Sequence, residues 1–281
     1  MTDTLQVQGE FAPAESSFAA ETLAAAVVAD AAADAVTAEP NGFIELGLAP
    51  ELVQAVADLG YTQPTSVQLK AIPLAMGSGN DSTSFIDLMV SSQTGSGKTA
   101  AFLLPVLHTL IQQQAAAEAE ERAAFERAVA EAAARGEPAP KRAKRKDPTN
   151  SRNFKAATPG ALILCPTREL AQQVAHDAID LVKHCRGLRV ANVVGGMPYQ
   201  LQIAKLQNAN LVVATPGRLL DLQRSMQIKL DKVQFLVVDE ADRMLDLGFS
   251  DDLAELNQLT AQRKQTMMFS ATFAPRIQQL A

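Results

Sequence analysis

The sequence predicts an α/β fold in which a doubly wound, mostly parallel β-sheet carries helices on both faces. The first observation is a series of short runs rich in Val, Ile and Leu without polar alternation, which is typical of parallel strands buried on both faces. The second is that these runs alternate with longer stretches of helical period. In such sheets ligands bind beyond the carboxyl ends of the strands, so functional residues are expected at the strand–helix junctions.

Six strands and three clear helices follow from these patterns. The predicted strands are Phe85–Ser91, Ala161–Pro166, Arg189–Val194, Asn210–Thr215, Val233–Asp239 and Gln265–Ser270. The predicted helices are Arg168–Cys185, Pro198–Gln207 and Gly217–Met226. With 281 residues, the chain is long enough for one large domain of this kind together with extensions.

Two zones depart from the globular pattern. Residues 1–42 contain seven acidic residues, no Lys or Arg and few large apolar side chains, so we expect a disordered or loosely helical, acidic, Ala-rich tail. Residues 112–158 begin as an Ala/Glu/Arg-rich stretch of high helix propensity and continue into the basic run Lys141–Lys146. We interpret this second zone as an insertion, a solvated helix followed by a mobile basic loop, within a domain that spans 43–281.

The composition predicts a cytoplasmic protein without a membrane segment. The acidic tail accounts for the net charge of −6, because without its seven acids 24 of the 31 acidic residues remain against 25 basic ones. A near-neutral remainder still permits a nucleic-acid partner where basic residues cluster. Cys165 and Cys185 indicate neither a disulfide framework nor a zinc site. The apolar stretch Leu23–Ala38 is interrupted by Asp30 and Asp34, which argues against a signal peptide and a transmembrane helix.

The first strand–helix junction has the pattern of a phosphate-binding loop. Residues 91–100 read SSQTGSGKTA, follow an apolar strand and open a helix, which is the context that a Walker A loop requires. Backbone N–H groups of such a loop wrap a phosphate, and the helix dipole adds a favourable field. Lys98 is predicted to reach the β- and γ-phosphates, and the Thr99 hydroxyl to ligate Mg²⁺. The predicted cradle consists of Gln93, Thr94, Gly95, Ser96 and Gly97.

One position of this loop departs from the general pattern. Ser92 stands where the first glycine is usual, and a small residue still fits there. The alternative interpretation of the segment is a glycine-rich turn that binds no nucleotide.

A second junction supplies carboxylates. The apolar run Phe235–Val238 ends in Asp239 and Glu240. An acid at a strand end beside a phosphate loop can hold Mg²⁺, usually through water, and a neighbouring acid can position and deprotonate the attacking water. We therefore assign the metal to Asp239 and the water to Glu240. The alternative is that both acids merely cap the next helix.

Together with five further motifs, these junctions resemble the DEAD-box ATP-dependent RNA helicases. Residues 239–242 spell Asp-Glu-Ala-Asp, the tetrapeptide after which that family is named. The other motifs follow in order: Gly60–Gln68 resembles the Q motif, Pro166–Ala171 motif Ia, Gly195–Gly196 the GG doublet, Thr215–Arg218 motif Ib and Ser270–Thr272 motif III. The resemblance covers residues 43–281 and implies a RecA-like P-loop domain. The run Arg243–Phe249 is most similar to bacterial RhlE-type helicases.

The resemblance implies how the nucleotide base is recognised. Gln68 would read the adenine edge, while Phe43 and Tyr61 would pack near the base or the ribose. A carboxamide can both donate to and accept from adenine, which favours ATP over GTP. The alternative is that Gln68 faces solvent and Phe43 is a core residue.

The resemblance also implies a track for RNA. The residues carried over to it are Pro166, Thr167, Arg168, Gly195, Gly196, Thr215, Pro216, Gly217 and Arg218. Hydroxyls, glycine N–H groups and arginines suit phosphates and 2′-hydroxyls, and no aromatic platform accompanies them, so recognition is expected to be independent of sequence. For each arginine the alternative is an internal salt bridge. Ser270 and Thr272 are expected to hydrogen-bond towards Asp242 and link the nucleotide to RNA, with helix capping as the alternative.

The implied function is that of an ATP- and Mg²⁺-dependent RNA helicase acting on RNA or ribonucleoprotein targets. A second RecA-like domain, missing from this chain, would supply further RNA contacts and an arginine for hydrolysis. The basic run Lys141–Lys146 would add non-specific RNA affinity, form a nuclear import signal or have no role. The alternative functions are a DNA-directed P-loop motor, a non-catalytic RNA-binding scaffold and a metabolic P-loop kinase.

Overall fold

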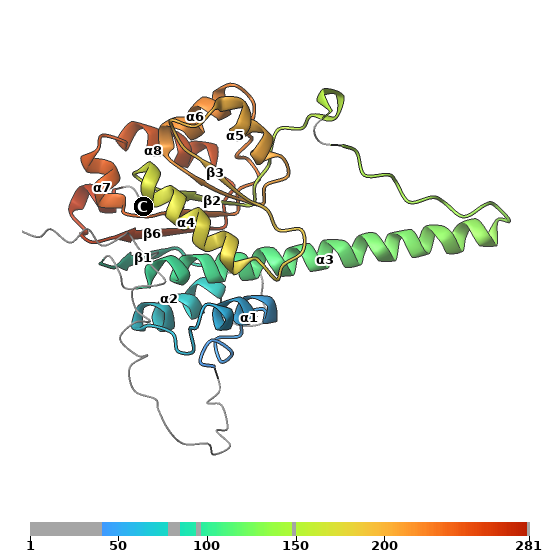
Figure 1. Ribbon diagram of the computed structural model, residues 1–281, viewed down its shortest axis with the longest axis horizontal. Coiled ribbons are helices and arrows are strands. Elements are labelled where there is room, and N and C mark those ends of the chain that lie inside the picture. Colours follow the sequence, from blue (N-terminus) through green and yellow to red (C-terminus); the bar gives the residue numbers. More distant parts are fainter. Residues whose placement is uncertain (1–40, 78–84, 94–96, 148–149, 280–281) are drawn as a thin grey trace, which may run out of the picture.

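A single six-stranded parallel sheet forms the centre of the protein (Figure 1). The computed structural model describes residues 41–77, 85–93, 97–147 and 150–279. The strands are β1 Leu88–Ser91, β2 Ala161–Leu164, β3 Val190–Val193, β4 Leu211–Ala214, β5 Phe235–Val238 and β6 Gln265–Ser270. Their order across the sheet is β1-β6-β5-β2-β4-β3, and every neighbouring pair is parallel. The predicted fold class and all six predicted strands are thus confirmed.

Helices cover both faces of this sheet. They are α1 Pro50–Asp58, α2 Ser66–Met76, α3 Lys98–Ala134, α4 Arg168–Leu181, α5 Tyr199–Leu206, α6 Pro216–Arg224, α7 Ala241–Asp246, α8 Ser250–Leu259 and α9 Pro275–Gln278, with a 3₁₀ turn at Ser151–Asn153. Residues of α1 to α4 pack in one hydrophobic cluster against the sheet, and residues of α5 to α9 pack in another. None of the described helices is both long enough and apolar enough to cross a membrane.

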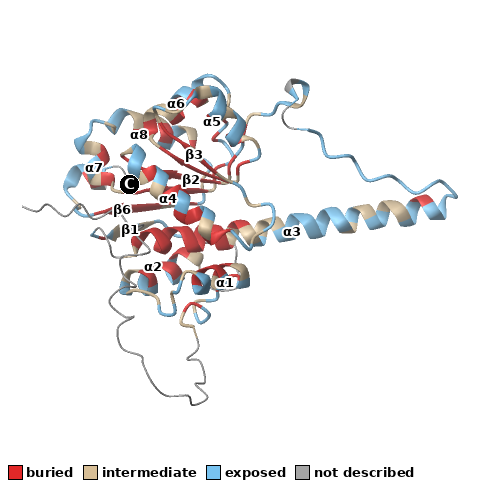
Figure 2. Cartoon of the chain, viewed as in Figure 1, coloured by how far each residue is buried: buried red, intermediate tan, exposed pale blue. Residues whose placement is uncertain are grey.

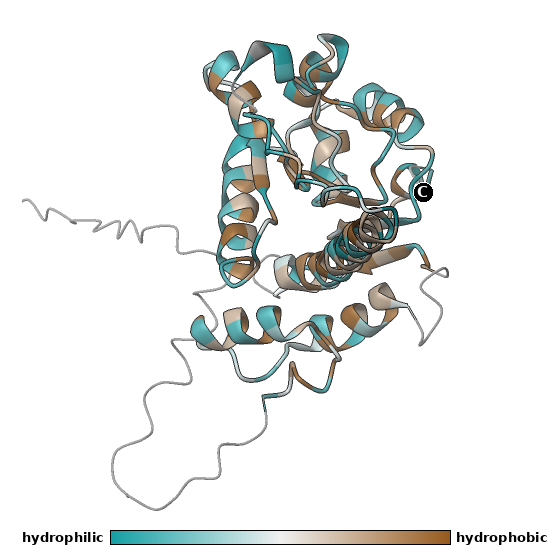
Figure 3. Cartoon of the chain, turned by 90° about the vertical axis from the view of Figure 1, so that its right-hand side faces the viewer, coloured by the Kyte–Doolittle hydropathy of each residue, from teal (hydrophilic) through white to brown (hydrophobic). Residues whose placement is uncertain are grey.

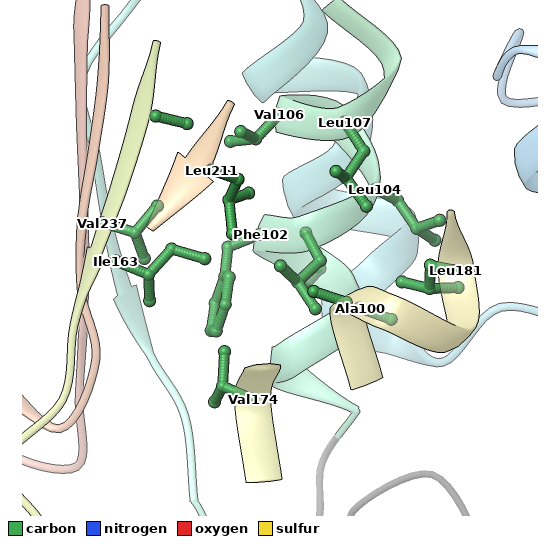
Figure 4. Close-up of a cluster of buried hydrophobic side chains, with 14 of the residues drawn as sticks. Ala100, Phe102, Leu104, Val106, Leu107, Ile163, Val174, Leu181, Leu211 and Val237 are labelled. Atoms are coloured by element: carbon green, nitrogen blue, oxygen red, sulfur yellow. The ribbon is translucent and has the colours of Figure 1, made fainter. Parts of the chain in front are cut away.

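The two clusters explain why the strands lack polar alternation. Along β2, Ile163 belongs to the cluster under α1 to α4, whereas Leu162 belongs to the cluster on the opposite face. Both side chains are fully buried, and the central strands β2, β4 and β5 are buried along their whole length, whereas β1 at the sheet edge is partly exposed (Figure 2). Phe102 of α3 lies within the first cluster beside Ile163 (Figure 4), and its ring meets Phe269 of β6 edge-on at a centroid distance of 5.2 Å.

The helical part of the predicted insertion belongs to α3. The sequence predicts a solvated helix from residue 112, and α3 runs without interruption from Lys98 to Ala134 before it gives way to a stretch without regular secondary structure. The helical part of residues 112–158 therefore continues the helix that starts at the phosphate loop. The insertion rejoins the body at its far end, where Ala157 is buried and pairs with Ile228. Except for Asn41 and Gly42, the predicted acidic tail lies outside the described residues.

Candidate functional site

The predicted nucleotide residues meet at one edge of the sheet. β1, β5 and β6 end there side by side, and α3 starts there. An open pocket of about 520 Å³ lies at this edge. It is lined by Ser92, Gln93, Lys98, Glu240, Asp242, Arg243, Ser270 and Ala271. Residues from the phosphate loop, the acidic junction and the end of β6, which are far apart in the sequence, thus share one cavity.

Lys98 is the centre of a buried charge cluster in this pocket. Its Nζ lies 3.1 Å from Oδ1 of Asp239 and 3.3 Å from Oε1 of Glu240, and its side chain is only 9% exposed. Burial lowers the pKa of Lys98, but the charges of Asp239 and Glu240 outweigh burial and raise it overall. Burial also raises the pKa of Asp239, and the nearby Lys98 offsets this only in part. Lys98 therefore favours the charged form of Asp239, which is buried away from water.

Two carboxylate oxygens in the cluster have unused capacity to accept. Oδ2 of Asp239 and Oε2 of Glu240 are buried and have no hydrogen-bond partner among the described residues. Buried polar atoms of this kind call for a ligand, a water or an ion. Thr99, also buried, directly follows Lys98 at the start of α3. One carboxylate and one hydroxyl suit Mg²⁺, which takes its remaining ligands from phosphates and water, so the residues present fit this ion.

The backbone of Glu240 is strained. Its φ of 49° and ψ of 54° place it in the left-handed region, at the residue that precedes α7. A non-glycine residue in this region costs of order 1–3 kcal/mol, and such residues cluster at functional sites. Arg243, one turn further along, places Nη1 3.5 Å from Oε2 of Glu240. The residue types gave no signal for this strain, and the spacing of three residues was the only clue to Arg243.

Motif III is joined to the acidic junction by hydrogen bonds. Ser270 Oγ accepts from the backbone N–H of Asp242 at 3.3 Å and donates to the carbonyl of Thr272 at 2.7 Å. Thr272 Oγ1 donates to Oδ2 of Asp242 at 3.4 Å. The expected contacts from Ser270 and Thr272 to Asp242 are therefore present. They connect the end of β6 to the first turn of α7, directly beside Glu240.

Gln68 is tied to both α2 and the phosphate loop. Its Oε1 accepts from the N–H of Thr65 at 3.0 Å within a capping box, and its Nε2 donates to the carbonyl of Gly97 at 3.1 Å. The alternative that Gln68 faces solvent is wrong, because the residue is only 6% exposed. One N–H and one lone pair of the amide remain, which is the pair that an adenine edge requires. Reading of adenine by Gln68 stays a prediction.

The other residues expected around the nucleotide lie in different environments. Phe43 is 2% exposed and packs in the hydrophobic cluster under α1 to α4, so in this structure it is a core residue. Tyr61 is half-buried against the same cluster. Gln93 lines the pocket. Thr94, Gly95 and Ser96 lie outside the described residues.

The residues of the predicted RNA track gather at the same edge, next to the pocket. They follow β2, β4 and β3, which are neighbours in the sheet, so motifs Ia, Ib and the GG doublet lie side by side (Figure 1). Arg168 is exposed and lies over Gly196, where a Cβ would come within 2.5 Å of Nη1. Thr167 accepts from the N–H of Leu170 and so caps α4. Pro166 and Pro216 are buried, so their side chains serve the fold.

Arg218 already has internal partners. Its Nη1 donates to the carbonyl of Met197 and to Oε1 of the buried Gln202, both at 3.1 Å. Its guanidinium also lies 5.9 Å from the centre of the Tyr199 ring. These contacts hold α6 against α5, so Arg218 has an internal role through hydrogen bonds, in place of the salt bridge that was the alternative to RNA contact. Its contact with RNA stays a prediction.

The chain is similar in sequence to a known family of helicases. The family model described as "DEAD/DEAH box helicase" matches residues 65–280. The chain is 39% identical over 247 residues to "DEAD-box ATP-dependent RNA helicase 52A" of rice, covering 86% of this chain and 35% of that protein. It is 36% identical to the ATP-dependent RNA helicase RhlB of Pseudomonas syringae, covering 85% of this chain and 50% of that protein.

Solved structures show the same similarity. A DEAD box protein from Methanococcus jannaschii has 31% identity and a TM-score of 0.63, with 85% of this chain and 52% of that chain covered. The ADP-bound RNA helicase Prp28 from Chaetomium thermophilum has 34% identity and a TM-score of 0.62, with 84% and 46% covered. The chain thus spans about half or less of the length of these relatives.

Proposed function

Because the chain belongs to the DEAD/DEAH box helicase family, we propose that the whole protein is an ATP-dependent RNA helicase and that this chain is its nucleotide-binding part. The observation that carries the proposal is the buried cluster of Lys98, Asp239 and Glu240 at the mouth of the phosphate loop. It places one ammonium and two carboxylates where the γ-phosphate of a bound nucleoside triphosphate would lie. This arrangement supports phosphoryl transfer to water rather than mere nucleotide binding.

In the proposed mechanism Lys98 exchanges partners. Without nucleotide its ammonium contacts Asp239 and Glu240, and with nucleotide it would contact the β- and γ-phosphates. Release of Lys98 would leave Asp239, together with Thr99, to hold Mg²⁺, which would offset the charge of the phosphates. It also leaves Oε1 of Glu240 free to orient the attacking water and take up its proton. Arg243 at Oε2 would hold the carboxylate in place meanwhile.

The proposed coupling to RNA runs through motif III. Ser270 and Thr272 bind Asp242, which lies two residues after Glu240, so a shift of β6 or of the loop after it reaches the water-activating residue. The predicted RNA track would bind phosphates and 2′-hydroxyls from the same edge of the sheet, without reading bases.

Fast hydrolysis is proposed to require a second RecA-like domain in the whole protein. An arginine supplied from outside the P-loop domain raises the rate of related phosphoryl transfers by ~10³–10⁵. This chain alone is therefore expected to bind ATP and to hydrolyse it slowly. We also propose a cytoplasmic location, a reducing compartment, since Cys165 and Cys185 are both free thiols.

Replacing Glu240 by Gln in the complete protein tests the mechanism. The variant is expected to bind ATP as tightly as the wild type and to lose RNA-stimulated phosphate release, because an amide cannot accept the proton of the attacking water. Stimulation of the wild type by DNA as strong as by RNA would favour the DNA-directed motor instead. Wild-type ATP binding without any RNA-stimulated phosphate release would favour the non-catalytic scaffold.

A further inference from the structure

Helix α3 leaves the body of the protein at Gln114. Just before that point α3 is held at the amino-terminal edge of the sheet. There the side chain of Gln113 exchanges hydrogen bonds of 2.7 and 2.9 Å with the side chain of Gln234, which immediately precedes β5. Leu110 and Gln114 also pack against Gly160 and Gly187, which precede β2 and β3. Beyond Gln114 the helix projects from the body (Figure 2), and Figure 3 looks along it from its far end.

The projecting part, residues 115–134, is built to stay helical in water. Eleven of its twenty residues are alanine, the strongest helix former. Glu118 and Arg122, like Glu131 and Arg135, stand at the i, i+4 spacing and in the orientation that stabilises an exposed helix. At ~1.5 Å per residue the twenty residues extend by about 30 Å. We call this helix the arm.

A basic segment without regular secondary structure follows the arm. Residues 141–146, which we call the strap, contain five Lys or Arg in six positions, and all are exposed. Pro138 and Pro140 exclude a helix just before the strap. Arg142 lies over the ring of Phe125 on the arm, with its Cζ 5.1 Å from the ring centre, which fastens the strap to the arm. Within the described residues no cation of the strap forms a salt bridge, although the arm carries five glutamates.

The strap lies on the side of the domain beyond the amino-terminal edge of the sheet, whereas the predicted RNA track lies at the carboxyl edge. α3 starts at the nucleotide edge and runs towards the amino-terminal edge of the sheet, where the arm emerges. From Lys98 to Phe125, over which Arg142 of the strap lies, the helix rises by ~40 Å. The cations of the strap therefore cannot extend the track formed by motifs Ia, Ib and GG, because the body of the domain lies between them.

We propose that the strap is a second binding site for RNA, which it holds by the phosphate backbone and independently of the nucleotide site. Five exposed cations, none in a salt bridge within the described residues, lie on an extended segment and match a polyanion with regularly spaced charges. They lack the fixed donor pairs that read bases, so binding would be independent of sequence. The arm would hold one part of an RNA away from the segment that the nucleotide edge acts on. This inference rests on the proposed RNA function.

Salt-dependent RNA binding by this chain tests the proposal. The variant K141Q/R142Q/K144Q/R145Q/K146Q is compared with K70Q/K205Q/K229Q/K232Q/K264Q, which removes the same charge from exposed lysines elsewhere. For a single-stranded RNA, each lost phosphate contact reduces the slope of log affinity against log salt by about 0.7. The strap variant is expected to lose up to ~3.5 of this slope and about tenfold or more in affinity at low salt. The control is expected to change the slope by less than ~1.

Cross-linking by ultraviolet light separates the strap from the track. RNA is expected to cross-link to peptides that contain residues 141–146 in the wild type and in Arg168→Gln, and not in the strap variant. If the strap variant and the control lysine variant lose the same slope of log affinity against log salt, the proposal is overturned, because RNA is then attracted by the overall charge of the chain and not by the strap. An unchanged slope in the strap variant would also overturn it and would favour a protein partner for the arm.

The outcomes distinguish this inference from the proposed function. If the wild-type chain binds no RNA at low salt, the strap site is refuted. ATP hydrolysis by the complete protein and its loss in Glu240→Gln would still decide the proposed function.

Discussion

Replacing Lys98 by Met tests how the buried charge cluster is balanced. Methionine keeps the length of the side chain but removes the ammonium that lies 3.1 Å from Asp239 and 3.3 Å from Glu240. Among the described residues Lys98 is the only cation in a salt bridge with Asp239, so the fully buried carboxylate would be left without a positive partner. At an effective dielectric constant of ~20, two unit charges ~3 Å apart attract by roughly 5 kcal/mol, part of which is offset by desolvation. Breaking a buried pair from one side typically costs ~3–5 kcal/mol, and we expect a loss of this size.

The loss is expected to grow with pH. Burial already raises the pKa of Asp239 in the presence of Lys98, and removal of Lys98 raises it further. The folded variant then retains a proton that the unfolded chain releases near its usual pKa of about 3.9. Where the folded state binds more protons, the free energy of unfolding falls as pH rises, by at most ~1.4 kcal/mol per pH unit for one group.

Urea unfolding of the nucleotide-free chain measures both effects. Above about pH 4, Lys98→Met should lose stability with rising pH more steeply than the wild type. The double variant K98M/D239N should recover most of the loss, because no buried charge remains on Asp239. If Lys98→Met unfolds within ~0.5 kcal/mol of the wild type and with the same pH dependence, Lys98 does not stabilise the buried charge of Asp239.

Two further substitutions test the core and the track. Phe102→Ala should lower the free energy of unfolding by ~3–5 kcal/mol, because the Phe102 side chain is fully buried. Phe154 is 43% exposed, so Phe154→Ala should lower it much less. Equal losses of the two variants in denaturant unfolding would contradict the assigned core. Gly196→Ala should cost roughly 1–2 kcal/mol, because its φ is +80°, and should weaken RNA binding by displacing Arg168. Gly47→Ala is the control, because Gly47 lies outside the track, has a φ of +76° and offers an added Cβ no neighbour within 4 Å; equal RNA affinities of the two alanine variants would speak against the track.

The sheet could be predicted because its signal is local. Buried parallel strands are apolar throughout, and each run is bounded by turn residues, so all six were found. β1 nevertheless begins at Leu88 instead of Phe85. The side chain of Gln265 donates to the carbonyl of Ile86, and the N–H of Thr266 donates to the side chain of Asp87, so side chains replace the backbone ladder there. No period in the sequence reveals that exchange.

The continuity of α3 could not be read from composition. The change from apolar to Ala/Glu-rich residues near Gln112 marks where the helix leaves the body, and both halves have high helix propensity. The composition therefore located the boundary between the buried and the solvated part of the helix, but it did not show that both parts form one helix.

In the candidate site, features that depend on residue types and spacing along the chain could be predicted, whereas features that depend on contacts between distant elements could not. The types and spacing of Lys98, Asp239 and Glu240 were sufficient to predict that they meet, because strand ends share one edge. The left-handed backbone of Glu240 and the internal bonds of Arg218 depend on neighbours from other elements. Such contacts have no counterpart in a single stretch of sequence.

Calorimetric titration of this chain with ATP and with GTP, in the presence and absence of Mg²⁺, tests most directly whether the cluster at the phosphate loop is a nucleotide site. We expect Mg²⁺-dependent binding of ATP, weaker binding of GTP, and loss of binding in the K98M/D239N variant, which retains the fold without the cluster. Absence of ATP binding by the folded wild type, or equal binding by K98M/D239N, would show that the cluster is not a nucleotide site.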